Sequence, residues 1–293
     1  MRARGVPAGA AMSFVVAHIT DTHLSAEKPY FVANFERFGE HLRRAAPDLV
    51  VNTGDISVNG ADSRDDLVAA RDLHEALGLN WRAIPGNHDI GDNQETAKKQ
   101  PIDAERHARY LDVFGEDRWV IDVPGWRLLA VNALLFGSDL AQAIDQERFI
   151  ADAVADLDGR SLALFLHKPL FFADPGEADS THLTVSPGPR QRLFDALGAV
   201  RPRVVCSGHL HEYRESLIGD MHHVWAPGTS FTVPGLLPTH GGEHTVGYVE
   251  IAFEADGRFE SRFVRPDGVD ILDLADFPGA YGDLRRIKTA IAE

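Results

Sequence analysis

The fold is decided by the stretch Phe14–Leu24, FVVAHITDTHL, in which an apolar, β-branched run passes directly into Asp21-Thr-His23. Such a run predicts a buried strand that ends at two polar side chains. A helix with apolar residues on one face is expected over residues 32–46, and a second apolar strand over residues 49–53. The order strand, helix, strand predicts a βαβ unit and hence a sheet with parallel strands.

Farther along the chain, the pattern changes from βαβ units to hairpins. The expected elements are a helix over 63–77, a strand over 81–84, a hairpin over 119–123 and 127–131, a helix over 145–157, a strand over 161–166, a helix over 190–197, a strand over 204–206 and a hairpin over 248–253 and 259–264. Together they predict an α/β fold of two packed mixed β-sheets flanked by helices, a four-layer sandwich. We expect one domain over residues 1–265. Residues 266–293 would form a C-terminal appendage that packs on the domain or on a partner subunit of a homo-oligomer.

The charge of the chain limits its partners. Its 293 residues carry a formal net charge of -15, so the field of the protein repels polyanions, and we expect no long nucleic acid as a partner. A small anionic substrate is compatible with this charge, because bound metal ions can reverse the potential inside one cleft.

Cysteine content and apolar runs indicate a cytoplasmic protein. The single cysteine, Cys206, allows no intrachain disulfide and no cysteine-rich zinc cage, and its apolar surroundings are typical of a core residue. The apolar run Phe14–Ile19, which follows the basic start Met1–Met12, is too short for the core of a signal peptide. Because no apolar stretch approaches the length of a membrane span, we expect no membrane partner.

Five short polar segments each follow a predicted strand. They are Asp21-Thr-His23, Gly54-Asp55, Gly86-Asn87-His88-Asp89, His167 and Gly208-His209-Leu-His211. Ligands of open α/β sheets bind at the carboxyl ends of the strands, so these segments could converge on one point. The glycines before Asp55, Asn87 and His209 fit tight turns that bring the backbone close to a bound ion.

The residue types indicate two metal ions. Two carboxylates, one amide oxygen and four imidazoles form a mixed oxygen and nitrogen set that suits Mn, Fe or Zn, as divalent or mixed-valence ions. Two neighbouring cations need a shared ligand to reduce their repulsion, and a carboxylate such as Asp55 can bridge them beside a hydroxide. The expected ligands are Asp21, His23, Asp55, Asn87, His167, His209 and His211.

In this order, the motifs DTH, GD, GNHD, a lone histidine after a strand and GHLH resemble the calcineurin-like metallophosphoesterase family, over roughly Ile19–His211. The resemblance implies two ligand sets: Asp21, His23, Asp55 and His211 for one ion, and Asp55, Asn87, His167 and His209 for the other. It also implies that His88 is not a ligand but reaches the substrate, to stabilise the transition state or protonate the leaving oxygen. Asp89 would either orient His88 or cap the following segment.

Three stretches narrow the resemblance: ITDTHL at 19–24, NTGD at 52–55 and APGTS at 226–230. They are similar to the class III cyclic nucleotide phosphodiesterases, a group that includes glycerophosphodiester-hydrolysing members. Val58 stands where purple acid phosphatases carry a tyrosine, three residues after the bridging aspartate. A coloured tyrosinate-iron site is therefore not expected.

The expected activity is hydrolysis of small phosphodiesters, most readily cyclic nucleotides, by in-line attack of a metal-bridging hydroxide without a covalent enzyme intermediate. A phosphomonoesterase acting on nucleotides or phosphoproteins is the alternative, since the same chemistry serves both. A non-catalytic interaction protein is a third interpretation, and the retention of every ligand motif argues against it.

Two long segments and four further histidines leave other interpretations open. Residues 168–189 form either a surface crossover or a substrate-facing lid, and their length favours the lid. Residues 234–247 could close over the substrate, although a solvated loop is favoured. The histidines expected outside the metal site are His222, His223, His240 and His244.

Overall fold

Two β-sheets face each other across an apolar core. The first sheet contains, in spatial order, β12 (Phe259–Val264), β11 (Tyr248–Phe253), β1 (Phe14–Ile19), β2 (Leu49–Asn52) and β3 (Trp81–Ala83). The second contains β10 (Glu243–His244), β8 (Glu212–Ile218), β9 (Met221–Trp225), β7 (Val204–Ser207), β6 (Ser161–Phe165), β5 (Trp126–Ala130) and β4 (Trp119–Val123). Both are mixed: β1, β2 and β3 run parallel, as do β5, β6, β7 and β9, while β11 and β4 are antiparallel to their neighbours.

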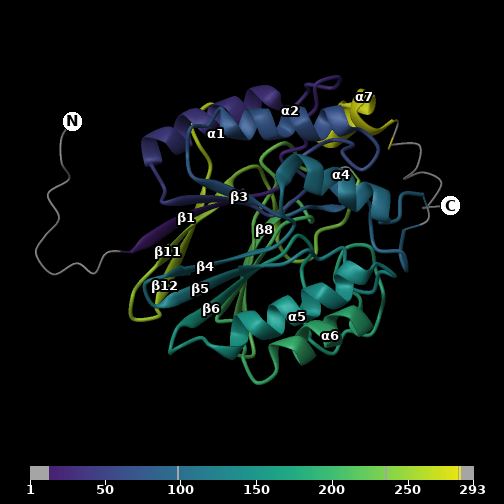
Figure 1. The fold of residues 1–293 in the computed structure, drawn as a ribbon. Helices are drawn as coiled ribbons and strands as arrows, with labels where there is room; N and C mark the ends of the chain where they lie inside the picture. Colours follow the sequence, from purple (N-terminus) through teal and green to yellow (C-terminus); the bar gives the residue numbers. More distant parts are fainter. Residues whose placement is uncertain (1–12, 98, 235, 283, 285–293) are drawn as a thin grey trace, which may run out of the picture.

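Helices cover the outer faces of the two sheets, so the layers run helix, sheet, sheet, helix (Figure 1). The helices over the first sheet are α1 (Val32–Ala45) and α2 (Arg64–Glu75), with α4 (Ala104–Phe114) beside them, and those over the second sheet are α5 (Ala141–Ala155) and α6 (Pro187–Leu197). The prediction of two mixed sheets flanked by helices is confirmed.

The description comes from a computed structural model and covers residues 13–97, 99–234, 236–282 and 284. The start of the chain, on which the signal-peptide argument depended, and residues 285–293 of the expected appendage lie outside the described residues. No helix in the described part is both long and apolar enough to cross a membrane.

The core follows from the apolar periodicity. Val16 and Val51 on the inner face of the first sheet pack in one cluster with Trp126 and Phe165 of the second. The outer face of the first sheet receives the apolar stripe of α1, in which Phe35, Phe38 and Leu42 are buried, as the helical spacing predicts. Removal of these side chains from water is the main force that stacks the four layers.

Two regions of regular structure carry no clear signal in the sequence. Helix α4 buries His107, Tyr110 and Val113 on its inner face. Because His107 and Tyr110 carry polar groups, this buried face does not stand out as an apolar stripe in the sequence. The hairpin of β8 and β9 contains Glu212 and Arg214. Their charges mask the alternation of apolar and polar residues that is typical of a strand. Their hydrogen-bond partners come from segments that only the folded chain brings near. Tertiary packing therefore decides these elements.

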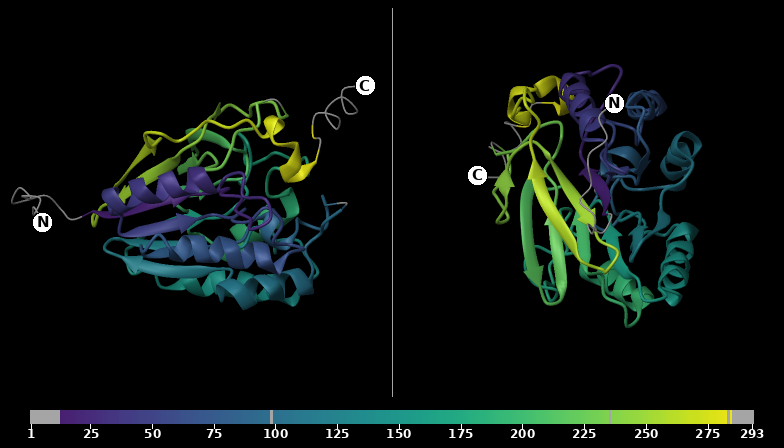
Figure 2. Two further views of the ribbon diagram at one scale, coloured as in Figure 1. Left: turned by 90° about the horizontal axis from the view of Figure 1, so that it is seen from above. Right: turned by 90° about the vertical axis from the view of Figure 1, so that its left-hand side faces the viewer.

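The chain beyond β12 returns to the loop end of the first sheet. Strand β12 runs in the direction of β1, and the yellow segment after it leads to the 3₁₀ turn η1 (Leu274–Asp276) and the short helix α7 (Pro278–Tyr281), shown in Figure 2. Asn34 of α1 donates to the carbonyl of Asp270, and Thr232 pairs with Asp273. The boundary at residue 265 and the contact with a partner subunit stay predictions.

Candidate metal centre

The five polar segments meet at one edge of the two sheets. Backbone hydrogen bonds join the turns: the Asp21 amide donates to the Gly54 carbonyl at 2.9 Å, and the Gly208 amide donates to the His167 carbonyl at 2.9 Å. The His209 amide donates to the Asp21 carboxylate at 2.9 Å and so connects the turns after β1 and β7. Strand ends from both sheets thus contribute to one site.

One cluster of ligand atoms comes from the turns after β1 and β7. Asp21, His23 and His211 each offer a nitrogen or oxygen atom, and these atoms lie within 4.8 Å of one another. Nε2 of His211 is 3.4 Å from Oδ1 of Asp21, and Nε2 of His23 is 3.9 Å from the same oxygen. All three residues are buried, so the cluster is preorganised by packing.

A second cluster lies beside the first and contains Asp55, His167 and His209. Nε2 of His167 is 3.4 Å from Oδ2 of Asp55 and 3.2 Å from Oδ1 of Asn87. The same Asp55 oxygen lies 4.0 Å from Nε2 of His23 in the first cluster. Asp55 is therefore the residue that could bridge two ions.

Some ligand atoms of the first cluster lack hydrogen-bond partners in the described part of the chain, and a metal ion could take the place of such partners. Among the described residues, two buried atoms that face the first cluster, Oδ1 of Asp21 and Nε2 of His23, have no hydrogen-bond partner. A buried polar atom without a partner is costly, and a cation would satisfy both. The chemistry and the arrangement of these side chains are therefore compatible with two metal ions.

The outer nitrogens of the imidazoles are anchored to backbone carbonyls. Nδ1 of His211 lies 2.9 Å from the Phe231 carbonyl, and Nδ1 of His167 lies 2.9 Å from the Thr53 carbonyl. In His209 it is Nε2, and not Nδ1, that is anchored: it lies 2.9 Å from the His182 carbonyl. Such hydrogen bonds set the tautomer and leave the inner nitrogen free to bind a metal.

Asp55 and His167 shift each other's pKa inside the site. Burial lowers the pKa of His167, but the Asp55 carboxylate outweighs it and raises that pKa to about 9. Burial raises the pKa of Asp55, but the imidazoles of His167 and His88 hold it well below its usual value. The two side chains form an ion pair at neutral pH, and a cation bound there would replace the imidazole proton.

Backbone conformation is unusual at the proposed ligands. Positive φ angles, which favour glycine, occur at the following ligands: Asp21 (51°), His23 (44°), Asp55 (49°), His209 (70°) and His211 (53°). The glycines that precede them allow very close approach of neighbouring turns. A Cβ on Gly86 would lie 2.2 Å from the amide nitrogen of Asp55, and a Cβ on Gly208 would lie 2.0 Å from the Thr20 hydroxyl.

His88 lies beside the clusters with about a third of its side chain exposed (30%). Its Nδ1 is 3.2 Å from the Val58 carbonyl, and its Nε2 is 3.9 Å from Oδ2 of Asp55. His88 also shares a possible ligand cluster with His23 and Asp55, so distance by itself does not distinguish a ligand from a substrate-facing group.

The hydrogen bonds of Asp89 fit the second of its two expected roles, the capping role, and none of them reaches His88. Its carboxylate accepts hydrogen bonds from the backbone amides of Ile56, Ser57 and Gly86 and from the Ser57 hydroxyl. These bonds brace the turns that carry Asp55 and Asn87, which is close to the capping role that was the alternative. The Val58 carbonyl takes the place of the expected carboxylate partner of His88 because the loop after β2 passes directly beside the imidazole.

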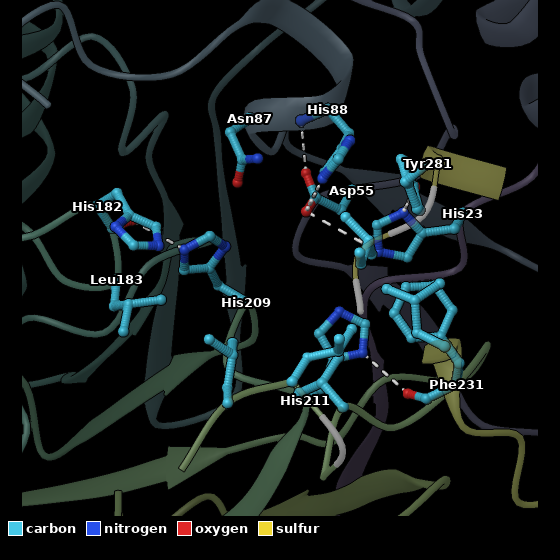
Figure 3. Close-up of a pocket in the computed structure, with 15 residues that line it drawn as sticks. His23, Asp55, Asn87, His88, His182, Leu183, His209, His211, Phe231 and Tyr281 are labelled. Carbon is cyan, nitrogen blue, oxygen red and sulfur yellow. Dashed lines mark hydrogen bonds and ion pairs between the residues drawn. The ribbon is translucent and has the colours of Figure 1, made fainter. Parts of the chain in front are cut away.

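A cavity of about 390 Å³ opens in front of the two clusters, as Figure 3 shows. Sequence reasoning missed four of its labelled wall residues: His182, Leu183, Phe231 and Tyr281. The Phe231 ring stacks on His211, and the Tyr281 hydroxyl contacts Nδ1 of His23. The length of segment 168–189 was a signal for the first two residues, whereas nothing in the sequence marks Tyr281, which lies 258 positions from His23.

Three of the four histidines expected outside the metal site contact residues away from the two clusters. His222 pairs with Glu215, and His223 packs on Phe171. His240 is stacked on Phe172 and bonded to the buried Glu212, so that part of segment 234–247 is anchored away from the clusters. Leu236 and Leu237 of the same segment do line the cavity. The segment is thus divided between an anchored part and a wall of the site.

A family model for calcineurin-like phosphoesterases matches residues 14–213 of the chain. The chain belongs to this family. It is accordingly a metal-dependent phosphoester hydrolase, and its two His/Asp clusters are compatible with the binuclear centre that the resemblance implies.

Two curated relatives and one solved structure extend the comparison within the calcineurin-like phosphoesterases. A probable cyclic nucleotide phosphodiesterase of Synechococcus sp. is 27% identical over 271 residues, which cover 87% of this chain and 93% of the relative. A probable glycerophosphodiester phosphodiesterase of Arcobacter nitrofigilis is 25% identical over 174 residues, 58% of this chain and 59% of the relative. Purple acid phosphatase PPD1 of yellow lupin has a TM-score of 0.64 at 14% identity, covering 90% of this chain and 53% of that chain, and so shares the fold.

Proposed function

We propose that this protein hydrolyses small phosphodiesters, most readily cyclic nucleotides, at a binuclear metal centre. The observation that carries the proposal is the pair of neighbouring ligand clusters, with Asp55 of the second 4.0 Å from His23 of the first, beside one cavity that His88 also lines. The names of the two curated relatives, one a probable cyclic nucleotide phosphodiesterase and one a probable glycerophosphodiester phosphodiesterase, support the choice of diesters.

The ligand sets proposed for the ions follow the two clusters. Asp21, His23, Asp55 and His211 would hold one ion, and Asp55, Asn87, His167 and His209 the other. When bound, such ions supply Lewis-acid activation of water and neutralise the charge that develops on the phosphoryl oxygens. They also give the cleft a positive potential within a protein whose net charge is -15.

His88 is the residue proposed to act on the substrate. The Val58 carbonyl fixes one ring nitrogen, and the backbone amide of His88 donates to Oδ1 of Asp55 at 2.8 Å. His88 lines the cavity, and in its imidazolium form the other ring nitrogen can donate a hydrogen bond to a phosphoryl oxygen or a proton to the leaving oxygen. Anchoring on both sides keeps this nitrogen in place during turnover.

The lining of the cavity favours diesters over monoesters. Among the described residues that line it there is no lysine or arginine to bind the second charge of a phosphomonoester dianion. A diester carries one negative charge and a second organic group, for which the apolar part of the lining offers space.

A comparison of two aryl substrates tests the proposal. Metal-stripped protein reconstituted with Mn²⁺, Fe²⁺ or Zn²⁺ should hydrolyse bis(4-nitrophenyl) phosphate faster than 4-nitrophenyl phosphate. Among natural esters, 3′,5′-cyclic AMP and 2′,3′-cyclic AMP should both exceed glycerophosphodiesters. Exclusive monoesterase activity would contradict the diesterase proposal, and the absence of both hydrolysis and stoichiometric metal would favour a non-catalytic interaction protein.

Matched aspartate variants provide the control for this comparison. Asp55→Asn should lose bound metal and activity together, because Asp55 is proposed to be a ligand in both sets and lies between the two clusters. Asp62→Asn changes an aspartate that is half exposed (50%) and paired with Arg106 outside the cavity lining, and it should behave as the wild type.

A further inference from the structure

One wall of the cavity is apolar and is built from two segments far apart in the sequence. The loop after β9 contributes Val233, Leu236 and Leu237, and the C-terminal segment contributes Leu274 and Leu284. We call these five residues the aliphatic wall. They belong to a hydrophobic cluster that is separate from the two clusters between the layers of the sandwich.

Backbone hydrogen bonds hold the aliphatic wall together. The Thr232 amide donates to the Leu272 carbonyl at 2.7 Å, and the Leu274 amide donates to the Thr232 carbonyl at 2.9 Å. Behind the wall, Phe31 packs on Phe231 with ring centroids 4.8 Å apart. The two segments are therefore fixed to each other as an ordered surface.

The aliphatic wall is continuous with the metal centre through one aromatic residue. The Phe231 ring stacks on His211 at 4.5 Å and lies 4.7 Å from His23, and all three residues line the same cavity as the wall. A phosphate held between the two ligand clusters would have its organic group within reach of this surface. The lining of the same cavity also includes polar residues, among them His88, His182 and His209, which Figure 3 labels.

The polar groups next to the aliphatic wall are already engaged. The Tyr281 hydroxyl contacts His23, and the Phe231 carbonyl is bonded to His211. Val233 and the four leucines carry no polar side-chain group at all. The wall thus offers apolar area and no side-chain hydrogen bond with which to read a nucleobase or a glycerol.

We infer that the aliphatic wall is the subsite for an organic group of the phosphodiester and selects it by apolar area. This inference rests on the proposed function and deepens it. Phosphodiesters with alkyl or other apolar groups should be better substrates than those with small polar groups, and cyclic nucleotides should be accepted with little regard for the base. Burial of apolar area against leucine is the physical source of the selection.

A series of alkyl 4-nitrophenyl phosphodiesters tests the inference, because the leaving group stays constant while the alkyl group changes from methyl to ethyl to butyl. A buried methylene increases binding about fourfold. We therefore expect kcat/KM of the metal-reconstituted protein to rise roughly tenfold or more from methyl to butyl.

Two leucine variants show whether the wall causes the effect. Leu237→Ser should lower the butyl-to-methyl ratio of kcat/KM below that of the wild type, because it replaces aliphatic area at the wall with a hydroxyl. The matched control is Leu217→Ser, which changes a leucine that is 71% exposed on β8 outside the cavity lining and should keep the wild-type ratio.

The outcomes separate the inference from the proposed function. A flat methyl-to-butyl series in an active enzyme would overturn the inference and leave the diesterase intact. A rising series that Leu237→Ser leaves unchanged would also overturn it, because the selection would then arise elsewhere. Failure of the reconstituted protein to hydrolyse any member would instead contradict the proposed function.

Discussion

A positive φ angle is shared by five of the seven proposed metal ligands. Residues other than glycine hold this conformation at a cost of about 1–3 kcal/mol each. Such strain persists only where the surrounding structure enforces it, and here the buried hydrogen-bonded turns do so. The strain is concentrated at the residues whose side chains must be positioned as ligands. This is the pattern expected of a site in which ligand placement is favoured over local stability.

Gly86 illustrates how closely these turns approach. Gly86→Ala would place a Cβ 2.2 Å from both the amide nitrogen and Oδ1 of Asp55, so the bridging carboxylate must move. A displacement of this size should lower kcat/KM on the order of a hundredfold. Metal content by atomic spectroscopy and steady-state kinetics measure the effect. Gly188→Ala, whose Cβ would meet nothing within 4 Å, is the matched control, and equal losses in both variants would contradict the explanation.

His88→Ala separates catalysis from metal binding. If His88 acts on the substrate, turnover should fall by a factor on the order of 10²–10⁴ while the metal content stays at the wild-type level. His222→Ala, which removes a partly exposed histidine paired with Glu215, serves as the control. Loss of one equivalent of metal in His88→Ala would instead make His88 a ligand, as its cluster with His23 and Asp55 also allows.

Tyr281 brings the C-terminal segment into contact with a proposed ligand. Its hydroxyl touches Nδ1 of His23, and its ring lies 4.8 Å from that of His88. Tyr281→Phe keeps the ring and removes the hydroxyl, so metal affinity should weaken roughly tenfold. Calorimetric metal titration of the stripped protein measures this. Tyr213→Phe, which removes a hydroxyl bonded to Glu215 outside the cavity lining, should leave the affinity unchanged, and an unchanged affinity in Tyr281→Phe would argue against the assignment.

At the scale of elements, helix α1 ends in an unfavourable conformation. Its C-cap, Ala46, is exposed and left-handed, with a φ angle of 49°. Ala46→Gly should raise the free energy of unfolding by about 1 kcal/mol, because glycine adopts this conformation without a Cβ penalty. Chemical denaturation measures the change. Ala76→Gly at the end of α2, where φ is -65°, should lower stability instead, and a shift of the same sign in both variants would disprove the argument.

Elements with clear periodicity were predicted within a few residues, and those that bury polar groups were not. Strand β1 and helix α1 follow directly from their apolar patterns. Helix α4 and strand β8 escape detection because His107 and Glu212 are buried together with partners from other segments, Asp117 in one case and His240 in the other. A polar residue at a core position hides the pattern unless its partner is known.

At the scale of the whole molecule, buried neutral histidines make stability depend on pH. Burial lowers the pKa of His18 to about 3 and that of His74 to about 4, below the value of 6.5 for an exposed histidine. At these two histidines the unfolded chain therefore binds more protons than the folded one below pH 6.5, so their contribution to stability falls as the pH decreases from there.

The contribution of His74 can be isolated by substitution. Between pH 6.5 and about 5 its burial should cost the wild type roughly 2 kcal/mol of unfolding free energy. His74→Gln, which cannot take up a proton, should show a correspondingly weaker dependence in urea denaturation at the two pH values. Parallel curves for the wild type and His74→Gln would refute the assignment.

The ligand motifs and their order along the chain, the strands that precede them and the family follow from the sequence by itself, because each motif is a local turn after a local apolar run. Tertiary structure decided the rest. The brace provided by Asp89, the anchor of His209 on His182, and the aliphatic wall all depend on segments that only folding brings together. Tyr281 meets His23 across 258 positions, and no local pattern encodes a contact at that separation.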